Sequence, residues 1–264
     1  MVIYNPTRRN RNIGTTKQGH GRDNRLVIPD VSNGERGWEE ELGRHQRILK
    51  HVKGRQILFI VDKNNNGCVH ACSIADILHV LEYLPSQDWT GVNTFFLRQS
   101  TRKQRLLKPV WGKLLYHANV SRFGQDSRQT GPAVILEAFG LNEIIKWPTS
   151  LRPQDQQELT RLSNDGYLIS RKGRHHIIHT TESSVRATQL YRTLLHEIGH
   201  WIHYVENVVK PSELGVDDQQ SLASVYFGRT VDEREAFAHS YAEKNRLHLE
   251  KFGIIPFNRI DILE

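Results

Sequence analysis

The residues of this chain whose types and spacing are best suited to chemistry form an H-E-x-x-H pattern, His196-Glu197-Ile198-Gly199-His200. The surrounding stretch, Val185–Asn207, carries apolar side chains at helical spacing, which predicts one amphipathic helix. Positions four apart lie on the same helix face, so the two imidazoles can take two corners of a zinc tetrahedron. Glu197 would lie beside them, within reach of a water molecule on the metal. The pattern therefore predicts a zinc site with Glu197 as general base.

A catalytic zinc site usually takes a third protein ligand from elsewhere in the chain. His203 is too close along the same helix, and the better candidate is Glu235. Thr230 and Glu233 have the spacing of a capping box, which predicts that a helix begins there and carries Glu235 in its first turns. Alternatively, Glu233 and Glu235 only complement the positive end of that helix.

Two segments together, His196–His200 and Glu235-Ala236-Phe237-Ala238, resemble the H-E-x-G-H … E-x-F-A pattern of gluzincin metallopeptidases. The resemblance covers about Arg174–Leu247 and is greatest to the anthrax lethal factor catalytic domain and the Pro-Pro endopeptidases. The ImmA/IrrE-type peptidases are the second choice. The resemblance implies Zn²⁺ bound by three ligands, which are His196, His200 and Glu235, with Glu197 as the general base.

The residue that would stabilise an oxyanion is less directly indicated by this resemblance. Lethal-factor-like enzymes carry a tyrosine seven residues before the ligand glutamate, and that position here is Gly228. Tyr226 lies two residues earlier, and we predict it as the catalytic phenol. Tyr204 is the other nearby phenol, and we interpret it as a packing residue.

The segment before the predicted zinc helix has the signature of a β-hairpin, with Tyr167–Ser170 and His175–His179 flanking the turn Arg171–Arg174. Zincin-like peptidases place an edge strand above the metal, where a substrate backbone can add as a further strand. We therefore predict that His175–His179 is a wall of the cleft. Alternation puts three of its residues on one face as candidate substrate-binding positions, namely His175, Ile177 and His179. Otherwise the histidines are polar positions of a half-exposed strand.

The rest of the chain predicts a mixture of helices and strands. Strands are expected at Ile57–Val61, Thr94–Leu97 and Ala133–Leu136, and helices at Trp38–Val52, Ser73–Tyr83 and Pro153–Asn164. Pro148 and Pro153 bracket a domain boundary near residue 150. We expect an N-terminal α/β lobe over residues 27–150, which selects a substrate or partner, and a zincin-like catalytic lobe over residues 151–264.

The positive charge is concentrated near the N-terminus. Residues 1–26 hold six basic residues and one acidic residue, a net +5 of the chain's +7. Because few of these residues are apolar, they predict a flexible basic arm that can attract nucleic acid. A second basic cluster, from Arg98 to Arg128 and including Lys113, has interleaved aromatic residues. We interpret it as a solvated basic face, with nucleic-acid binding as the alternative.

Composition narrows the classes of protein that this chain can belong to. No apolar run reaches the length of a membrane span, and the N-terminus has no apolar core of signal-peptide length. Cys68 and Cys72 are the only cysteines, too few for a disulfide framework, and we interpret both as small apolar residues of a helix start. We therefore expect a cytoplasmic protein without a membrane partner, and the sequence does not indicate an oligomeric state.

These observations predict a zinc-dependent endopeptidase that hydrolyses a peptide bond in a protein or peptide substrate. The alternative is a non-catalytic zinc-containing protein that binds nucleic acid or another partner. Glu197 favours the enzyme, because a structural zinc site needs no base there. The expected fold is α+β, with a zincin-like core that comprises a mixed sheet, an active-site helix and a glutamate helix, and with an N-terminal α/β portion.

Overall fold

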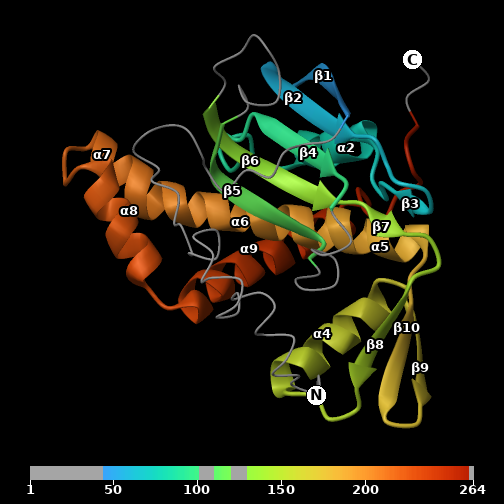
Figure 1. The fold of residues 1–264 in the computed structure, drawn as a ribbon. Coiled ribbons are helices and arrows are strands. Elements are labelled where there is room, and N and C mark those ends of the chain that lie inside the picture. Colours follow the sequence, from blue (N-terminus) through green and yellow to red (C-terminus); the bar gives the residue numbers. More distant parts are fainter. Residues whose placement is uncertain (1–43, 101–109, 120–129, 262–264) are drawn as a thin grey trace, which may run out of the picture. The chain divides into compact units, whose positions relative to one another are not determined.

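The structure is a computed structural model that describes residues 44–100, 110–119 and 130–261. It is a mixed α+β protein, as expected (Figure 1). The predicted basic arm and most of the second basic cluster lie outside the described residues.

A five-stranded mixed sheet lies at the centre of the described chain (Figure 1). Its strands, in spatial order, are β1 (His45–Val52), β2 (Arg55–Asp62), β4 (Thr94–Arg98), β6 (Thr130–Glu137) and β5 (Gly112–Asn119). The inner strands β2, β4 and β6 are parallel, whereas β1 and β5 pair antiparallel at the two edges. The three predicted strands are confirmed, and their nearly continuous apolar runs fit strands covered on both faces.

The predicted helix over Trp38–Val52 is wrong in its described part, because His45–Val52 is the edge strand β1. It pairs with β2 over its whole length, from His45 opposite Asp62 to Val52 opposite Arg55. Lys53 and Gly54 form the connection with φ values of 48° and 71°. Positive φ at both central residues is typical of the two-residue turn that joins hairpin strands. The sequence signal for a hairpin here was therefore the pair Lys53-Gly54, whereas the helical spacing of apolar residues in Trp38–Val52 was misleading.

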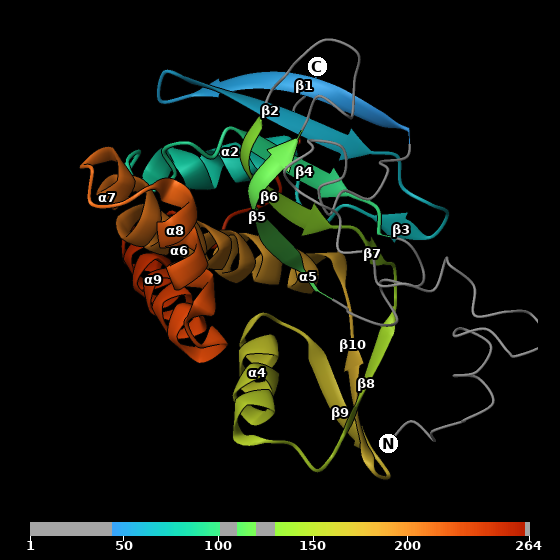
Figure 2. The same cartoon turned by 60° about the vertical axis from the view of Figure 1, so that its left-hand side comes forward.

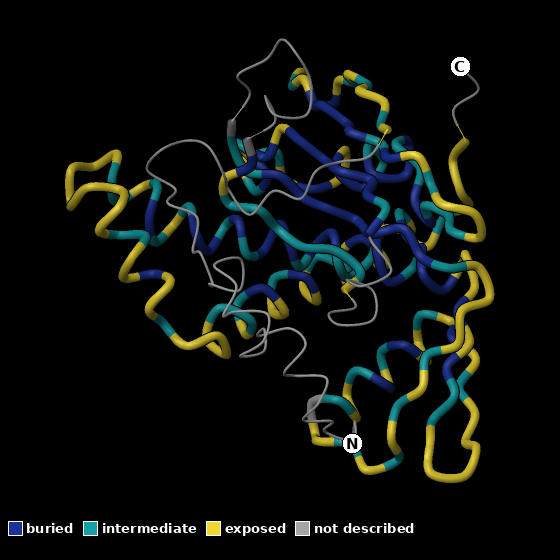
Figure 3. Tube along the Cα trace, in the orientation of Figure 1, coloured by how far each residue is buried: buried dark blue, intermediate teal, exposed yellow. Residues whose placement is uncertain are grey.

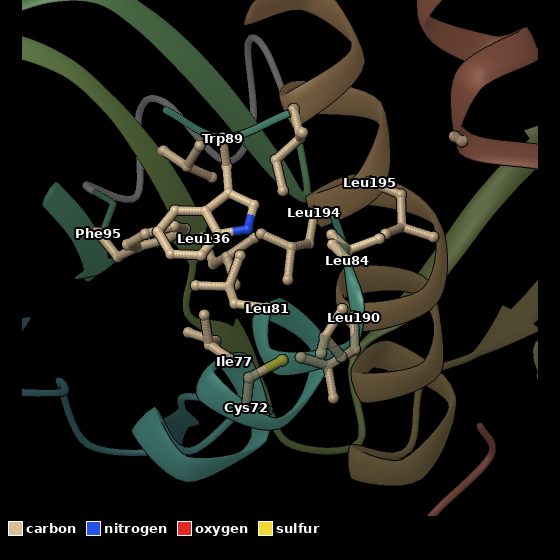
Figure 4. Packing of buried hydrophobic residues seen from close by; sticks show 14 of the residues in the cluster. Cys72, Ile77, Leu81, Leu84, Trp89, Phe95, Leu136, Leu190, Leu194 and Leu195 are labelled. Carbon is tan, nitrogen blue, oxygen red and sulfur yellow. The ribbon is translucent and has the colours of Figure 1, made fainter. Parts of the chain in front are cut away.

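The main hydrophobic core lies on one face of the sheet, where strand residues meet the helices (Figure 4). Helix α2 (Ile74–Tyr83) begins with a capping box between Ser73 and Asp76, close to the predicted start. Trp89 and Leu81 are fully buried in this core, together with Leu194 from the opposite helix. Cys72 is also buried there, and its thiol donates to Gln189 Oε1 at 3.4 Å, in keeping with a packing role.

The predicted helix over Val185–Asn207 is confirmed as part of a longer helical run. The run comprises α5 (Glu182–Thr188), η4 (Gln189–Thr193), α6 (Leu194–Tyr204), η5 (Val205–Val209) and α7 (Lys210–Glu213). The segments η4 and η5 are π-helical turns on either side of α6, an irregularity often found beside functional sites. Two further helices follow, α8 (Gln219–Gly228) and α9 (Val231–Lys251), and α9 lies alongside α6 (Figures 1 and 2).

A smaller sheet extends away from the five-stranded sheet (Figure 2). It contains β8 (Ile144–Pro148), β10 (His175–His179) and β9 (Leu168–Lys172), in that order. Helix α4 (Pro153–Asn164) has the predicted bounds, and its buried Leu159 and Leu162 join the main core. The remaining strands, β3 (Cys68–Val69) and β7 (Phe139–Gly140), form a two-stranded ribbon.

The described residues form one compact unit, and the structure does not divide them near residue 150, where we expected a boundary. The reason is that strands before residue 150 and helices after it share the same hydrophobic core. Within the second basic cluster, Arg98 is not on a solvated face. It is 7% exposed and donates to Glu137 Oε1 at 3.1 Å. None of the helices in the described part of the chain is both long and apolar enough to span a membrane.

Candidate metal centre

The two histidines of the H-E-x-x-H pattern project from α6 toward one carboxylate of α9. His196 Nε2 lies 3.2 Å from Glu235 Oε2, and His200 Nε2 lies 3.5 Å from Glu235 Oε1. The helical spacing of the histidines gives them a common face, whereas Glu235 reaches them only because α9 packs against α6. The three side chains predicted as metal ligands are therefore brought together.

Gly199 permits this close approach of the two helices. A Cβ atom at this position would lie 3.0 Å from Ala238 Cα and 3.1 Å from Ala238 O. These are backbone atoms of α9, which cannot rotate away as a side chain can. Thr230 caps α9 by accepting from Glu233 N at 3.3 Å, so the cap lies where the sequence predicts it. The start of α9 at Thr230 and the close contact at Gly199 together set where Glu235 lies relative to His196 and His200.

The donor set fits a zinc ion. Two imidazole nitrogens and one carboxylate are the ligands of many catalytic zinc sites, which leave a fourth position open. The hydrogen bonds from His196 and His200 lower the pKa of Glu235, which keeps this carboxylate ionised. Both Nε2 atoms face Glu235, whereas the Nδ1 atoms of both histidines are buried and have no hydrogen-bond partner among the described residues.

Glu197 is buried between α6 and the edge strand β5. It is 8% exposed, and its Oε2 accepts a hydrogen bond of 2.7 Å from the backbone N–H of Leu114. Burial raises the pKa of Glu197, and the nearby imidazoles and this backbone N–H oppose the rise. A carboxylate with a raised pKa is a better proton acceptor near neutral pH than an exposed one.

His239 is a site residue that the sequence reasoning missed. It lies on α9 one turn after Glu235, and its ring centroid is 4.5 Å from that of His196. Potential ligand atoms of His196, Glu235 and His239 all lie within 4.8 Å of one another. The sequence signal that could have identified His239 is its spacing of four residues from Glu235, because residues four apart lie on one face of a helix.

A cavity of about 870 Å³ adjoins these residues. His196, Glu197 and His239 line it, together with Trp111 and Gly112 at the start of β5. Much of the remaining wall is charged and internally paired. Arg192 donates to Glu158 and Asp165, and Arg246 donates to Glu243 and Glu250. The cavity is thus polar at a distance from the metal centre as well as beside it.

Tyr226 does not line this cavity. It is 1% exposed, and its Oη lies 3.3 Å from His203 Nδ1. Tyr226 packs in an aromatic group with Tyr116, Tyr204 and Phe227. The structure thus gives Tyr226 a packing position, whereas His239 lies beside His196 and Glu235. Tyr204 packs as expected.

The predicted substrate-binding residues on His175–His179 are not placed at the cavity, which is a correction. This strand, β10, is not an edge strand but the centre of the smaller sheet, with β8 and β9 on its two sides. His175, Ile177 and His179 are not among the residues that line the cavity. The edge strand beside the metal centre is β5, which we had interpreted only as part of a basic cluster.

Gly112, at the start of β5, lets this strand pack closely. A Cβ atom there would lie 2.5 Å from Ile135 O and 2.8 Å from Thr193 Cγ2, so only glycine fits between β6 and η4.

No protein-family model matches the chain, and no match was found among curated proteins or solved structures.

Proposed function

We propose that this protein is a zinc-dependent peptidase with a zincin-like core. The observation that carries the proposal is the convergence of His196, His200 and Glu235 beside the buried carboxylate of Glu197. Of these four, His196 and Glu197 line the cavity of about 870 Å³. A structural zinc site would need a fourth protein ligand and no buried base. The antiparallel edge strand beside the H-E-x-x-H helix supports a zincin-like arrangement.

His196, His200 and Glu235 would hold the metal. A bound zinc ion supplies Lewis acidity, which makes water nucleophilic near neutral pH and polarises a carbonyl group. Glu197 would accept the proton of the attacking water and deliver it to the leaving amine. Its bond to Leu114 N–H fixes one carboxylate oxygen and leaves the other for this proton transfer.

His239 is the residue best placed to stabilise a developing oxyanion. It lines the cavity, and it lies on the α9 face that also carries Glu235. Its imidazole can donate an N–H to an oxygen bound between α9 and β5. We therefore assign to His239 the role that we first gave to Tyr226.

The edge of β5 would hold the backbone of a peptide substrate. Leu114 N–H points away from β6, because it donates to Glu197. Backbone groups alternate in direction along an antiparallel strand, so those of Gly112 also point away from β6, next to the Leu114 N–H that Glu197 occupies. A substrate strand pairing there would cross the metal centre, as in recognition by strand addition.

The rival function is a non-catalytic zinc-containing protein that binds nucleic acid or another partner. It is favoured by one observation, the closeness of His239 to His196 and Glu235, which would let His239 close the tetrahedron as a fourth ligand. The two functions make opposite predictions for His239→Ala. This change should leave zinc affinity almost unchanged if His239 stabilises an oxyanion, and should weaken it strongly if His239 is a ligand.

The central test is the metal content of the purified full-length protein, followed by an activity screen on a diverse peptide library. We expect about one zinc per chain. It should be lost in the double variant His196→Ala/His200→Ala. Protein that is purified without chelators and holds no transition metal would refute the proposal. A zinc-loaded protein that cleaves no peptide, and that loses zinc in His239→Ala, would favour the rival function.

A further inference from the structure

The hairpin of β9 and β10 carries a concentration of positive charge that the proposed function does not use. The strands β8, β9 and β10 and the hairpin turn hold four basic residues and no acidic residue, namely Lys146, Arg171, Lys172 and Arg174. All four are exposed. Within the described part of the chain, none of the four has a carboxylate partner. The cations of the cavity wall, by contrast, are paired.

Three of these cations, Arg171, Lys172 and Arg174, lie at the tip of the hairpin, and Lys146 lies two residues farther from the tip, opposite Ile177. Together they do not lie on one face only. Arg171 and Lys172 are neighbours in a strand, so their side chains point to opposite faces. Lys172 shares its face with Lys146, since both follow the register of β10, and Arg174 lies in the turn. The exposed apolar residues Leu168 and Ile144 lie at the other end of the strands.

The tip is also accessible. Figure 3 shows an exposed end to the three strands, and Figures 1 and 2 place it away from the five-stranded sheet. The opposite end of the sheet is anchored, because Ile178 is buried in the main core and Ile145, its partner on β8, packs against that core. A rigid base and a charged free end are suited to contact with a large partner.

We propose that this hairpin tip binds the phosphate backbone of double-stranded DNA without sequence preference. The three strands, at spacings of about 4.8 Å, span about 10 Å from β8 to β9, which is less than the width of about 12 Å of a major groove. Cations on both faces of this sheet can then reach the phosphates on both sides of the groove. An acidic protein would engage mainly one face, and the deep, narrow major groove of an RNA duplex would exclude the three-stranded sheet. The proposal does not depend on peptidase activity.

The test measures the affinity of the full-length protein for a fluorescent DNA duplex by anisotropy, over a range of salt concentrations. The hairpin variant is Lys146→Gln/Arg171→Gln/Lys172→Gln/Arg174→Gln. The matched control is Lys63→Gln/Lys210→Gln/Lys244→Gln/Lys251→Gln, which removes the same charge from four exposed lysines elsewhere. Circular dichroism checks that both variants fold.

We expect the hairpin variant to bind DNA at least tenfold more weakly at low salt. Its slope of log affinity against log salt should fall by about 3–4, because each lost phosphate contact removes about 0.9. The control should change the slope by less than about 1, and the charge-preserving variant Arg171→Lys/Arg174→Lys should bind like the wild type.

Equal losses in the hairpin and control variants would assign any binding to net charge and overturn the proposal. Unchanged binding of the hairpin variant, or no binding by the wild type, would do the same. If a polyglutamate peptide competes as well as DNA, the tip is a site for acidic proteins, and the DNA assignment is wrong.

Discussion

The contact at Gly199 links helix packing to metal binding and gives the sharpest test of the site. In Gly199→Ala the new Cβ would lie 3.0 Å from Ala238 Cα, 3.1 Å from Ala238 O and 3.1 Å from Tyr241 Cβ. Carbon atoms in favourable contact lie about 3.5–4.0 Å apart, so α9 must move away by roughly half an ångström. Glu235 lies on α9 one turn before Ala238 and moves with it.

The expected effect on stability is small, whereas the effect on zinc is large. Overpacking costs about 1–3 kcal/mol, and alanine gains about 1 kcal/mol over glycine within a helix. The net loss in the free energy of unfolding should therefore be about 0–2 kcal/mol. Zinc ligands tolerate displacements of only about 0.2 Å, so we expect zinc affinity to fall at least tenfold, as measured by competition with a chromogenic chelator.

Two control variants isolate the backbone contact. Gly228→Ala adds a methyl group where no atom lies within 4 Å, so zinc affinity should not change. Adding Ala238→Gly to Gly199→Ala should not restore zinc binding, because the closest contacts are to the Cα and O atoms of residue 238. Wild-type zinc affinity in Gly199→Ala would refute the view that α9 sets the position of Glu235. Rescue by Ala238→Gly would show that side-chain crowding is the cause.

Three further predictions concern other residues. In Glu197→Gln, zinc should stay bound while hydrolysis drops by about 10²–10⁴-fold, since an amide cannot accept the proton; undiminished cleavage would remove Glu197 from the mechanism. Glu235→Ala should release zinc. Glu233→Gln loses an exposed ion pair with Arg229, so its free energy of unfolding should fall by at most about 1 kcal/mol and its zinc should stay bound. Elemental analysis of both variants checks this, and zinc loss in Glu233→Gln but not in Glu235→Ala would contradict it. Asp76 is fully buried, and although burial alone would raise its pKa, hydrogen bonds from Arg186, Ile260 and Ser73 lower it. Its stabilising contribution should be complete above the unfolded pKa of about 3.9 and should disappear as the pH falls through the folded pKa. Urea unfolding of the wild type and Asp76→Asn between pH 7 and pH 2 would check this, and a stability difference that does not shrink in acid would contradict it.

The sequence alone located the parts of the site that depend on local structure. The spacing of His196 and His200, the cap at Thr230 and the bounds of Pro153–Asn164 all follow from helical periodicity and end signals within a few residues. Such signals can be recognised in the sequence because helix hydrogen bonds connect residues that are close in sequence.

The tertiary structure alone decided which strand lies beside the metal centre. Strand pairing joins residues far apart in the chain, and nothing local to β5 or β10 indicates which of them is an edge. The same dependence on long-range packing explains why the sequence pointed to Tyr226 as the residue that stabilises the oxyanion, and why we now propose His239. Tyr226 is close to Glu235 in sequence, yet packing of α8 buries its phenol against His203. His239 reaches the site because α9 lies along α6, and this contact depends on the missing side chain of Gly199.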